Sequence, residues 1–201
     1  MIGNGNDGES GRAGWGDAER PLLPDGWADG TLELEVDLGC HRGAFLAAMA
    51  ERFPETRWLG VEKLSGRVER CLAKFGRVGL ENAWAIRGEG LTDVRRVLPG
   101  GSVAAIHVSF PDPWPKRRHW PRRVVNRETL EDAWVLLAVG GTLRLMTDDA
   151  DYFGAMERAV VEDGRFAVAE WDDGREQAET EFERKFAEIG QRVFRLALRK
   201  F

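Results

Sequence analysis

The chain has few of the residues that mark secreted, metal-binding or membrane-spanning proteins. Its 201 residues include two cysteines, Cys40 and Cys71, and three histidines, without the spacing of a metal site or a disulfide framework. No apolar run approaches the roughly 20 residues of a membrane span, and the N-terminus lacks the basic and apolar segments of a secretion signal. These absences predict a cytoplasmic protein with no metal and no membrane partner, in which both cysteines are small buried side chains.

Charge is distributed unevenly along the chain, although the net charge is only −5. Residues 1–30 hold six acidic residues against two arginines, and residues 162–188 hold ten acidic residues against four basic ones. Residues 116–127, called the basic run below, hold six Lys or Arg and no acidic residue. A nucleic-acid backbone would be attracted to the basic run; a solvated loop whose charges only aid solubility is the alternative.

Apolar periodicity divides the chain into a tail and one α/β domain. Residues 1–30 are rich in Gly, Asp, Asn and Pro without periodicity, which predicts a flexible acidic tail in which Trp15 and Trp27 can dock. Residues 31–201 are long enough for one domain with a full-sized core.

Within that domain, strand and helix patterns alternate. Strand patterns lie at residues 32–38, 57–62, 82–87, 103–110, 142–147, 166–169 and 193–198, and helical spacing at residues 45–53, 68–75, 94–98, 130–137 and 153–160. Strand and helix alternate five times before two strands end the chain. This order predicts a mostly parallel seven-stranded sheet with helices on both faces.

One carboxylate stands between two prolines at the end of a predicted strand. Asp112 lies between Pro111 and Pro113, just after the apolar run at residues 103–108 and just before the basic run. The prolines restrict the backbone on both sides of the acid. Ligands of open α/β sheets bind beyond the carboxyl ends of the strands, so Asp112 is a candidate site residue. A proline-stiffened turn with a capping Asp is the alternative.

Three further acids follow three consecutive predicted strands: Asp37, Glu62 and Glu89. The glycine turn at residues 39–43 lacks the Lys and Ser/Thr of a Walker motif, and Asp37 beside it would repel a pyrophosphate. A cationic ligand such as S-adenosylmethionine, with its sulfonium and ammonium groups, fits better. Asp37 would then accept from the amino-acid moiety, Glu62 from the ribose hydroxyls and Glu89 from the adenine amine. Helix capping and surface charge are the alternative.

His41 occupies the middle of the glycine turn. If that position needs a positive φ, a side chain there costs about 1 kcal/mol or more. His41 is therefore either an adaptation or a sign of weakened cofactor binding. His107, in the middle of a predicted strand, is expected to be a hydrogen-bonded core residue.

The chain resembles the tRNA (guanine-N7-)-methyltransferase family from about residue 34 to its end. The resemblance is carried by DLGCHRG at residues 37–43, LGVE at 59–62, FPDPWPK at 110–116, Arg118, His119, Arg122 and Arg123, TD at 147–148, and TEFE at 180–183. It implies a Rossmann-like class I methyltransferase fold. It also implies transfer of the methyl group of S-adenosylmethionine to N7 of a variable-loop guanine in tRNA.

Roles for individual residues follow. The resemblance implies that Asp112 is catalytic and that the methyl donor is bound by Asp37, Gly39, Gly43, Glu62, Glu89 and Asp112. It implies that the guanosine is bound by Lys116, Asp148, Thr180, Glu181, Phe182 and Glu183. The basic run would contact tRNA phosphates through Arg117, Arg118, Arg122 and Arg123. Trp114 or Trp120 could stack on an extruded base.

Two other functions stay open at this point. His41, where the family usually has glycine, and the acidic tail would also suit a catalytically weakened, tRNA-binding relative. A methyltransferase acting on a small molecule or a protein would leave the basic run without a role. We expect a monomer, with a homodimer as the alternative.

Overall fold

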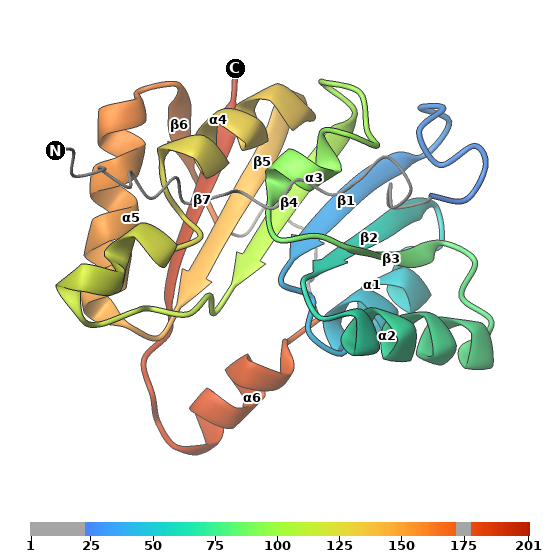
Figure 1. Ribbon diagram of the computed structural model, residues 1–201, viewed down its shortest axis with the longest axis horizontal. Coiled ribbons are helices and arrows are strands. Elements are labelled where there is room, and N and C mark those ends of the chain that lie inside the picture. Colours follow the sequence, from blue (N-terminus) through green and yellow to red (C-terminus); the bar gives the residue numbers. More distant parts are fainter. Residues whose placement is uncertain (1–22, 172–177) are drawn as a thin grey trace, which may run out of the picture.

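Seven strands form one sheet in the computed structural model, which describes residues 23–171 and 178–201 (Figure 1). The strands are β1 (Glu33–Leu38), β2 (Thr56–Glu62), β3 (Ala83–Arg87), β4 (Val103–Ser109), β5 (Leu137–Thr147), β6 (Phe166–Ala169) and β7 (Phe194–Lys200). Their order across the sheet is β3-β2-β1-β4-β5-β7-β6. Strands β1 to β5 run parallel, and β7 is antiparallel to β5 and β6. The predicted seven-stranded, mostly parallel α/β architecture is confirmed.

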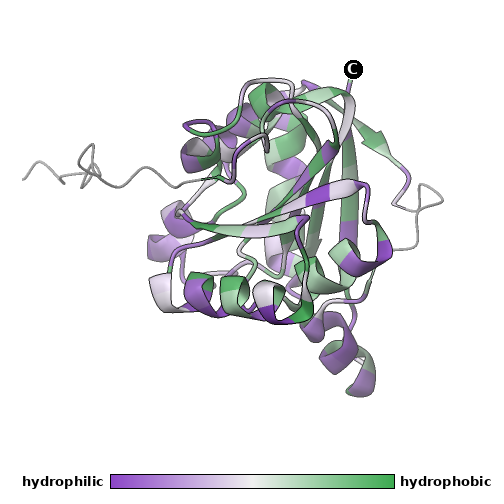
Figure 2. Ribbon diagram, turned by 90° about the vertical axis from the view of Figure 1, so that its right-hand side faces the viewer, coloured by the Kyte–Doolittle hydropathy of each residue, from purple (hydrophilic) through white to green (hydrophobic). Residues whose placement is uncertain are grey.

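Helices cover both faces of this sheet. They are α1 (Ala44–Arg52), α2 (Ser65–Val78), α3 (Leu91–Val94), α4 (Arg127–Leu136), α5 (Ala150–Asp163) and α6 (Glu181–Glu188), with a 3-10 helix η1 (Arg117–Arg122). One buried apolar cluster joins α1 and α2 to the sheet, and a second joins it to α3, α4 and α5. Figure 2 shows the pattern, with hydrophobic residues along the strands and hydrophilic residues on the outer surfaces of the helices.

Alternation along β1 separates these two cores. Leu34, Val36 and Leu38 belong to the cluster with α3, α4 and α5. Glu35 faces the other side, where its carboxylate lies 2.7 Å from Nε2 of His107. The His107 ring packs 5.2 Å from the ring of Phe45 in α1. The prediction that His107 is a hydrogen-bonded core residue is confirmed.

The bounds of β5, α3 and β7 are among those that differ from the sequence prediction. Strand β5 begins at Leu137 rather than at residue 142, because Gly140 takes a φ of 81° and stays within the strand. The pairing register with β4 shifts at this point, as at a β-bulge. Helix α3 is a single turn, and β7 begins one residue later and ends two residues later than expected.

Part of the predicted tail packs on the domain. Trp27 is buried, with its ring 6.5 Å from that of Trp84. Arg57 donates through Nη1 to the Trp27 carbonyl and to Asp29, at 3.2 and 2.7 Å. The docking of Trp27 is therefore confirmed, and the packed part of the chain begins before residue 31. Trp15 lies outside the described residues.

The described residues contain neither a candidate membrane span nor a candidate metal cluster. In residues 23–171 and 178–201, no helix has the length and apolarity needed to cross a membrane. The same residues contain no group of three or more His, Cys, Asp or Glu that could hold a metal ion.

Candidate active site

The parallel strands bring four loops to one edge of the sheet. The strand order reverses between β1 and β4, and such a switch point leaves a crevice between the loops that follow the two strands. A cavity of about 320 Å³, called the main cavity below, lies there. Four of the six residues predicted to bind the methyl donor line it: Gly39, Glu62, Glu89 and Asp112.

Asp37, the fifth of those residues, lines an adjoining cavity of about 40 Å³. Its side chain is at the end of β1 and only 5% exposed. Burial raises the pKa of Asp37 to about 6, and the nearby charge of His107 lowers the pKa by a smaller amount. A buried carboxylate that has lost its hydration is a favourable partner for a cationic ligand group.

Two glycines of the turn after β1 have different structural roles. Gly39 has a φ of 86°, and a Cβ there would meet no atom within 4 Å, so its backbone faces open space toward the cavities. Gly43, the N-cap of α1, has a φ of 63°, and a Cβ there would lie 2.9 Å from the Phe75 ring. Gly43 is thus required for packing α1 against α2, and its predicted cofactor contact stays a prediction.

His41, between these glycines, has a φ of 52°. The condition stated from the sequence, that this position takes a positive φ, is therefore met. Such a conformation costs a non-glycine residue on the order of 1 kcal/mol. Cys71 helps to hold it, since its thiol donates to the His41 carbonyl at 3.6 Å. Both cysteines are buried and free, as predicted.

Glu62 and Glu89 are held differently at the ends of β2 and β3. The Glu62 carboxylate is buried, accepts from the Leu64 N–H at 3.0 Å and lies 3.5 Å from Nη1 of Arg67. The Glu89 side chain is exposed, and its backbone N–H donates to Asp93 at 2.8 Å. Neither α2 nor α3 has a side-chain hydrogen bond at its N-cap, so the capping part of the alternative does not hold. The exposed Glu89 side chain agrees with surface charge, the other part of that alternative.

Asp112 lies on the exposed rim of the main cavity. The loop around it is strained, since Phe110 and Trp114 have φ values of 51° and 44°. Two hydrogen bonds fix this loop: Phe110 N–H donates to the Met146 carbonyl at 2.8 Å, and Arg123 Nε donates to the Pro113 carbonyl at 2.8 Å. Strain of this kind concentrates at functional sites. The Asp112 carboxylate caps no helix, so the capping alternative does not hold.

The basic run forms η1 and the segments on either side of it. The side chains of Lys116, Arg117, Arg118 and Arg122 are exposed, as phosphate contact requires. Trp120 is 42% exposed, with the Arg117 guanidinium 5.4 Å from its ring centre.

Arg123 does not fit its predicted role in phosphate contact. The residue is 7% exposed, and its guanidinium lies 4.6 Å from the Tyr152 ring centre and 4.9 Å from that of Trp120. Its Nε–H is used by the Pro113 carbonyl. Burial between two rings withdraws the charge from solvent, so Arg123 anchors the Asp112 loop instead.

The segment at residues 180–183 starts α6, beyond the ends of β4 and β5 (Figure 1). Thr180 and Glu183 form a capping box, with reciprocal hydrogen bonds of 3.0 and 2.9 Å between each side chain and the other's N–H. Glu183 also accepts from Arg195 at 2.9 Å. Both side chains therefore have a structural role that their predicted guanosine contact did not include.

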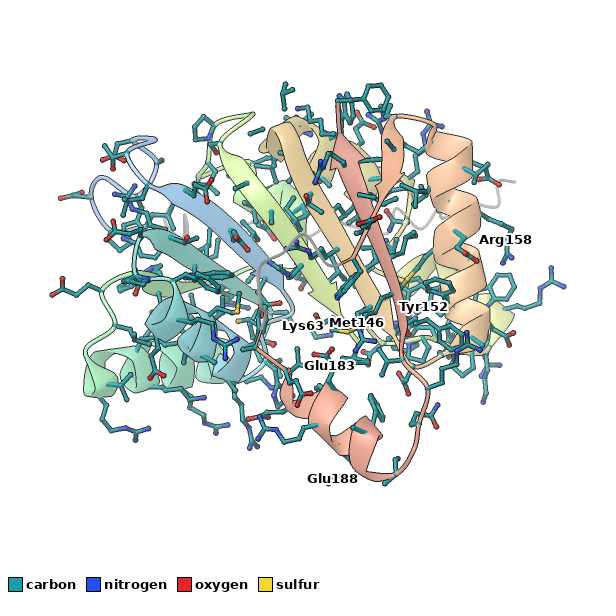
Figure 3. All side chains as sticks on the ribbon, turned by 180° about the vertical axis from the view of Figure 1, so that it is seen from behind. Lys63, Met146, Tyr152, Arg158, Glu183 and Glu188 are labelled. Atoms are coloured by element: carbon teal, nitrogen blue, oxygen red, sulfur yellow. The ribbon has the colours of Figure 1, made fainter. Side chains whose placement is uncertain are left out.

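Of three other predicted guanosine contacts, two line the cavities and the third, Asp148, does not. Phe182 lines both cavities and Glu181 lines the smaller one. Asp148 is half-buried after β5, and its carbonyl accepts from Gln191 Nε2 at 3.3 Å. Figure 3 shows Lys63, Met146 and Tyr152 near the strand ends, with Glu183 below them and Glu188 at the outer end of α6.

Sequence reasoning missed several residues of the site. Ser109, the last residue of β4, lines both cavities, and Arg67 of α2 lines the main cavity. Tyr152 of α5 holds the segment after η1, because its hydroxyl accepts from the Val125 N–H at 3.0 Å. Its ring packs on Arg123, which anchors the Asp112 loop. The position of Ser109 directly before FPDP was a usable signal, whereas nothing local in the sequence marks Tyr152.

A cavity of about 560 Å³ lies elsewhere, between α4 and α5. It is lined by Arg127, Glu131, Glu162, Asp163 and Arg165 among others. The guanidinium of Arg165 is paired there with Asp163. No strand ends at this cavity and its charges are mixed, so its size alone does not make it the candidate site.

Comparisons with known proteins agree with this geometry. A protein family described as "Putative methyltransferase" matches residues 32–196. A protein named tRNA (guanine-N(7)-)-methyltransferase from Anaeromyxobacter dehalogenans is 39% identical over 196 residues, covering 90% of this chain and 94% of its own. A protein of the same name from Thermotoga maritima is 28% identical over 184 residues, which is 90% of this chain and 59% of that relative.

The fold has solved counterparts as well. A crystal structure of an aminoglycoside resistance methyltransferase superposes with a TM-score of 0.59 at 17% identity, covering 85% of this chain and 89% of that one. This likeness confirms the predicted Rossmann-like methyltransferase fold. The family match and the 39% identity over most of both sequences show more: the chain belongs to the tRNA (guanine-N(7)-)-methyltransferase family.

Proposed function

We propose that the protein transfers the methyl group of S-adenosylmethionine to N7 of a guanine in tRNA. The observation that carries the proposal is the main cavity, where Glu62, Glu89 and Asp112 converge at the switch point of the sheet beside the basic run. Relatives that bear the name of this activity cover most of the chain. The proposal includes a monomeric enzyme, with a homodimer as the alternative.

The acids and the turn of the cavity suit this methyl donor. Asp37 offers a desolvated carboxylate for the ammonium group, and Glu62 offers a buried carboxylate, fixed by the Leu64 N–H, for the ribose hydroxyls. Gly39 leaves its backbone open to the ligand. When bound, S-adenosylmethionine supplies a methyl group activated by a sulfonium.

The chemistry of guanine N7 explains why a carboxylate serves at the rim. N7 has an in-plane lone pair and no proton, so its methylation needs no strong general base. Alignment of the reacting groups is the main task, and it can contribute several kcal/mol to lowering the barrier. The purine gains positive charge as the bond forms, and the Asp112 carboxylate can stabilise that charge.

The nucleic acid would approach across the basic run. Lys116, Arg117, Arg118 and Arg122 are exposed next to the loop that holds Asp112. Cations in this place attract the phosphate backbone and fix the orientation of the tRNA without reading its sequence. Trp120, exposed among these arginines, can stack on an unpaired base.

The test is methylation of tRNA that lacks the modification. The purified protein is incubated with this tRNA and methyl-labelled S-adenosylmethionine, and the digested nucleosides are identified by mass spectrometry. The proposal expects label in 7-methylguanosine, and Asp112→Ala as the matched control should form it more slowly by about 100-fold or more. Label in another nucleoside, or no labelled RNA at all, would refute it. Label in a small molecule or a protein from an extract would favour the alternative substrates.

A further inference from the structure

His41 and Phe182 form a wall that both cavities share. The residues that line both the 40 Å³ cavity beside Asp37 and the main cavity are Gly39, His41, Ser109 and Phe182. Gly39 adds only backbone and Ser109 ends a buried strand, so the movable part of this wall consists of His41 and Phe182. Their rings lie 6.2 Å apart, tilted by 60°.

An aromatic cluster joins this wall to the rest of the site. Phe110, from the Asp112 loop, lies 5.8 Å from Phe182 and 5.1 Å from Phe186 by ring centres. The cluster therefore connects the glycine turn after β1, the loop after β4 and helix α6.

Helix α6 has little else to hold it. None of its residues is buried, and Phe182 is 40% exposed. It is also held by the capping box, by the ion pair between Glu183 and Arg195, and by the hydrogen bond from the Gln191 N–H to the Phe186 carbonyl. A helix with so few buried contacts has low local stability, and its position responds to a change in one packing partner.

A ligand bound at Asp37 would contact the wall of His41 and Phe182. The cavity beside Asp37 measures about 40 Å³ and meets the main cavity at this wall. A donor that occupies both cavities therefore lies against the His41 ring. Since the backbone of His41 is held by the turn, a displacement of its ring is passed to the neighbouring Phe182 ring.

We propose that His41 is a positioning residue through which binding of the methyl donor seats α6 for the guanosine. This rests on the proposed function for the identity of the two ligands. Donor entry moves the His41 ring, the ring repositions Phe182, and the aromatic cluster then holds α6 over the main cavity. The two ligands consequently bind with positive coupling, which by linkage is equal in both directions.

The first test needs no tRNA and uses hydrogen exchange of the amides in residues 181–190. S-adenosylhomocysteine should slow this exchange in the wild-type protein and in His41→Phe, which keeps a ring. It should leave exchange unchanged in His41→Gly and in His41→Asn, which tolerates a left-handed backbone but has no ring. Phe153→Leu, which alters a separate aromatic pair with Phe194, is the control and should behave as wild type. Equal slowing in His41→Asn and wild type would overturn the proposal.

The second test measures the coupling itself. The affinity for S-adenosylhomocysteine is measured with and without tRNA in the wild type, His41→Gly, Phe182→Ala and the double variant. The wild type should bind about fivefold or more tightly with tRNA present, and each single variant should lose this factor. The double variant should be no worse than either single one, because the two rings act in one contact. Additive losses would contradict the proposal.

The outcomes separate this inference from the proposed function. If the wild type methylates tRNA and His41→Gly keeps the same coupling, the inference is contradicted and the proposed function stands. If the wild type neither binds nor methylates tRNA, the proposed function is contradicted. The exchange experiment would then still decide whether His41 links the donor to α6.

Discussion

The two halves of the candidate site, which comprises the main cavity and the smaller cavity beside Asp37, hold their carboxylates in opposite ways. Asp37 and Glu62 belong to strands, are buried, and are surrounded by backbone that ordinary strand geometry dictates. Asp112 and Glu89 belong to loops, and their side chains are exposed. Strained backbone follows the same division in part, since Phe110 and Trp114 flank Asp112 with positive φ values while the strand-borne acids have none.

This difference shows how work is divided within the site. The strand-borne half can bind one kind of small cationic ligand, because its charges are desolvated and its geometry is fixed. The loop-borne half must accept a large polyanion, so it keeps its charges in solvent and takes its rigidity from prolines, strain and the buried Arg123. Changes in the two halves should therefore have different signatures.

Replacing the loop-borne acid should affect activity most. Asp112→Ala is expected to lower kcat about 100-fold or more, because the developing charge on the purine loses its carboxylate. Asp112 accepts no hydrogen bond from the described residues, so the melting temperature should stay within about 2 °C of wild type. The rate of 7-methylguanosine formation and a thermal melt measure the two effects. A fully active variant would remove Asp112 from catalysis.

Replacing the strand-borne Asp37 should weaken ligand binding and raise the stability of the protein. Asp37→Asn is expected to weaken binding of S-adenosylhomocysteine about tenfold or more, since a charge-assisted hydrogen bond is lost. It should raise the free energy of unfolding by on the order of 1–3 kcal/mol at pH 7, because burial of the ionised carboxylate no longer opposes folding. Calorimetry and denaturant titration measure both; a destabilised variant would contradict the account.

Acid should reproduce the binding loss in the wild-type protein. The pKa of Asp37 is raised to about 6 in the folded state, so the carboxylate gains its proton as the pH falls through 6. Affinity for S-adenosylhomocysteine should be constant above about pH 7 and fall by up to about tenfold per pH unit below 6. Folding stability changes in the opposite direction from ligand affinity. The free energy of unfolding falls as the pH rises from 3.8 toward 6, because the unfolded chain loses the Asp37 proton more readily than the folded protein does. In Asp37→Asn the binding profile should be flat over this range.

Replacing each of two neighbouring arginines in the basic run should show that one serves mainly stability and the other mainly tRNA binding. Arg123→Ala is expected to cost about 1–3 kcal/mol of stability, since a buried hydrogen bond and two ring contacts are lost. Arg122→Ala should cost about 1 kcal/mol or less, because an exposed guanidinium loses its contact 5.1 Å from the Trp114 ring centre. It should also reduce the slope of tRNA affinity against salt by about one. Melting curves and filter binding at several salt concentrations distinguish the two. A stable Arg123→Ala with a reduced salt slope would restore its predicted phosphate contact.

The smallest effect is expected at the start of α6. Thr180→Ala removes one member of the capping box and should cost about 1 kcal/mol or less, confined to α6. Exchange of the α6 amides should accelerate while the global melting temperature stays unchanged, and Thr180→Ser should restore the wild-type rate. A large fall in melting temperature would mean that α6 is part of the main folding unit.

The strand-borne half could be predicted from the sequence because it follows from periodicity. Alternation in β1 and β2 fixes which end of each strand carries its acid, and parallel pairing brings those ends together. The place of His41 between two turn glycines raised the question of a positive φ, and the structure gives a φ of 52°. The element bounds failed where local signals conflict, as at Gly140, which stays inside β5 because a bulge absorbs its φ of 81°.

The loop-borne half could be predicted only in its composition. Charge showed that residues 116–127 are basic, but burial is a tertiary property, so Arg122 and Arg123 could not be told apart. The partner that buries Arg123 is Tyr152, which lies 29 positions later in α5. The spacing of Thr180 and Glu183 is that of a capping box, so their structural role could have been predicted from the sequence. The sequence analysis gave them only the guanosine contact that the family resemblance implies.

A crystal structure of the protein with S-adenosylhomocysteine tests the central claim most directly, since the claim is that the strand-borne acids hold the donor facing the loop-borne one. The account predicts the ligand in the main cavity, with its ammonium at Asp37, its ribose hydroxyls at Glu62 and its sulfur on the side of Asp112. Ligand density elsewhere, such as in the cavity between α4 and α5, or a bound ligand whose sulfur points away from Asp112, would contradict it.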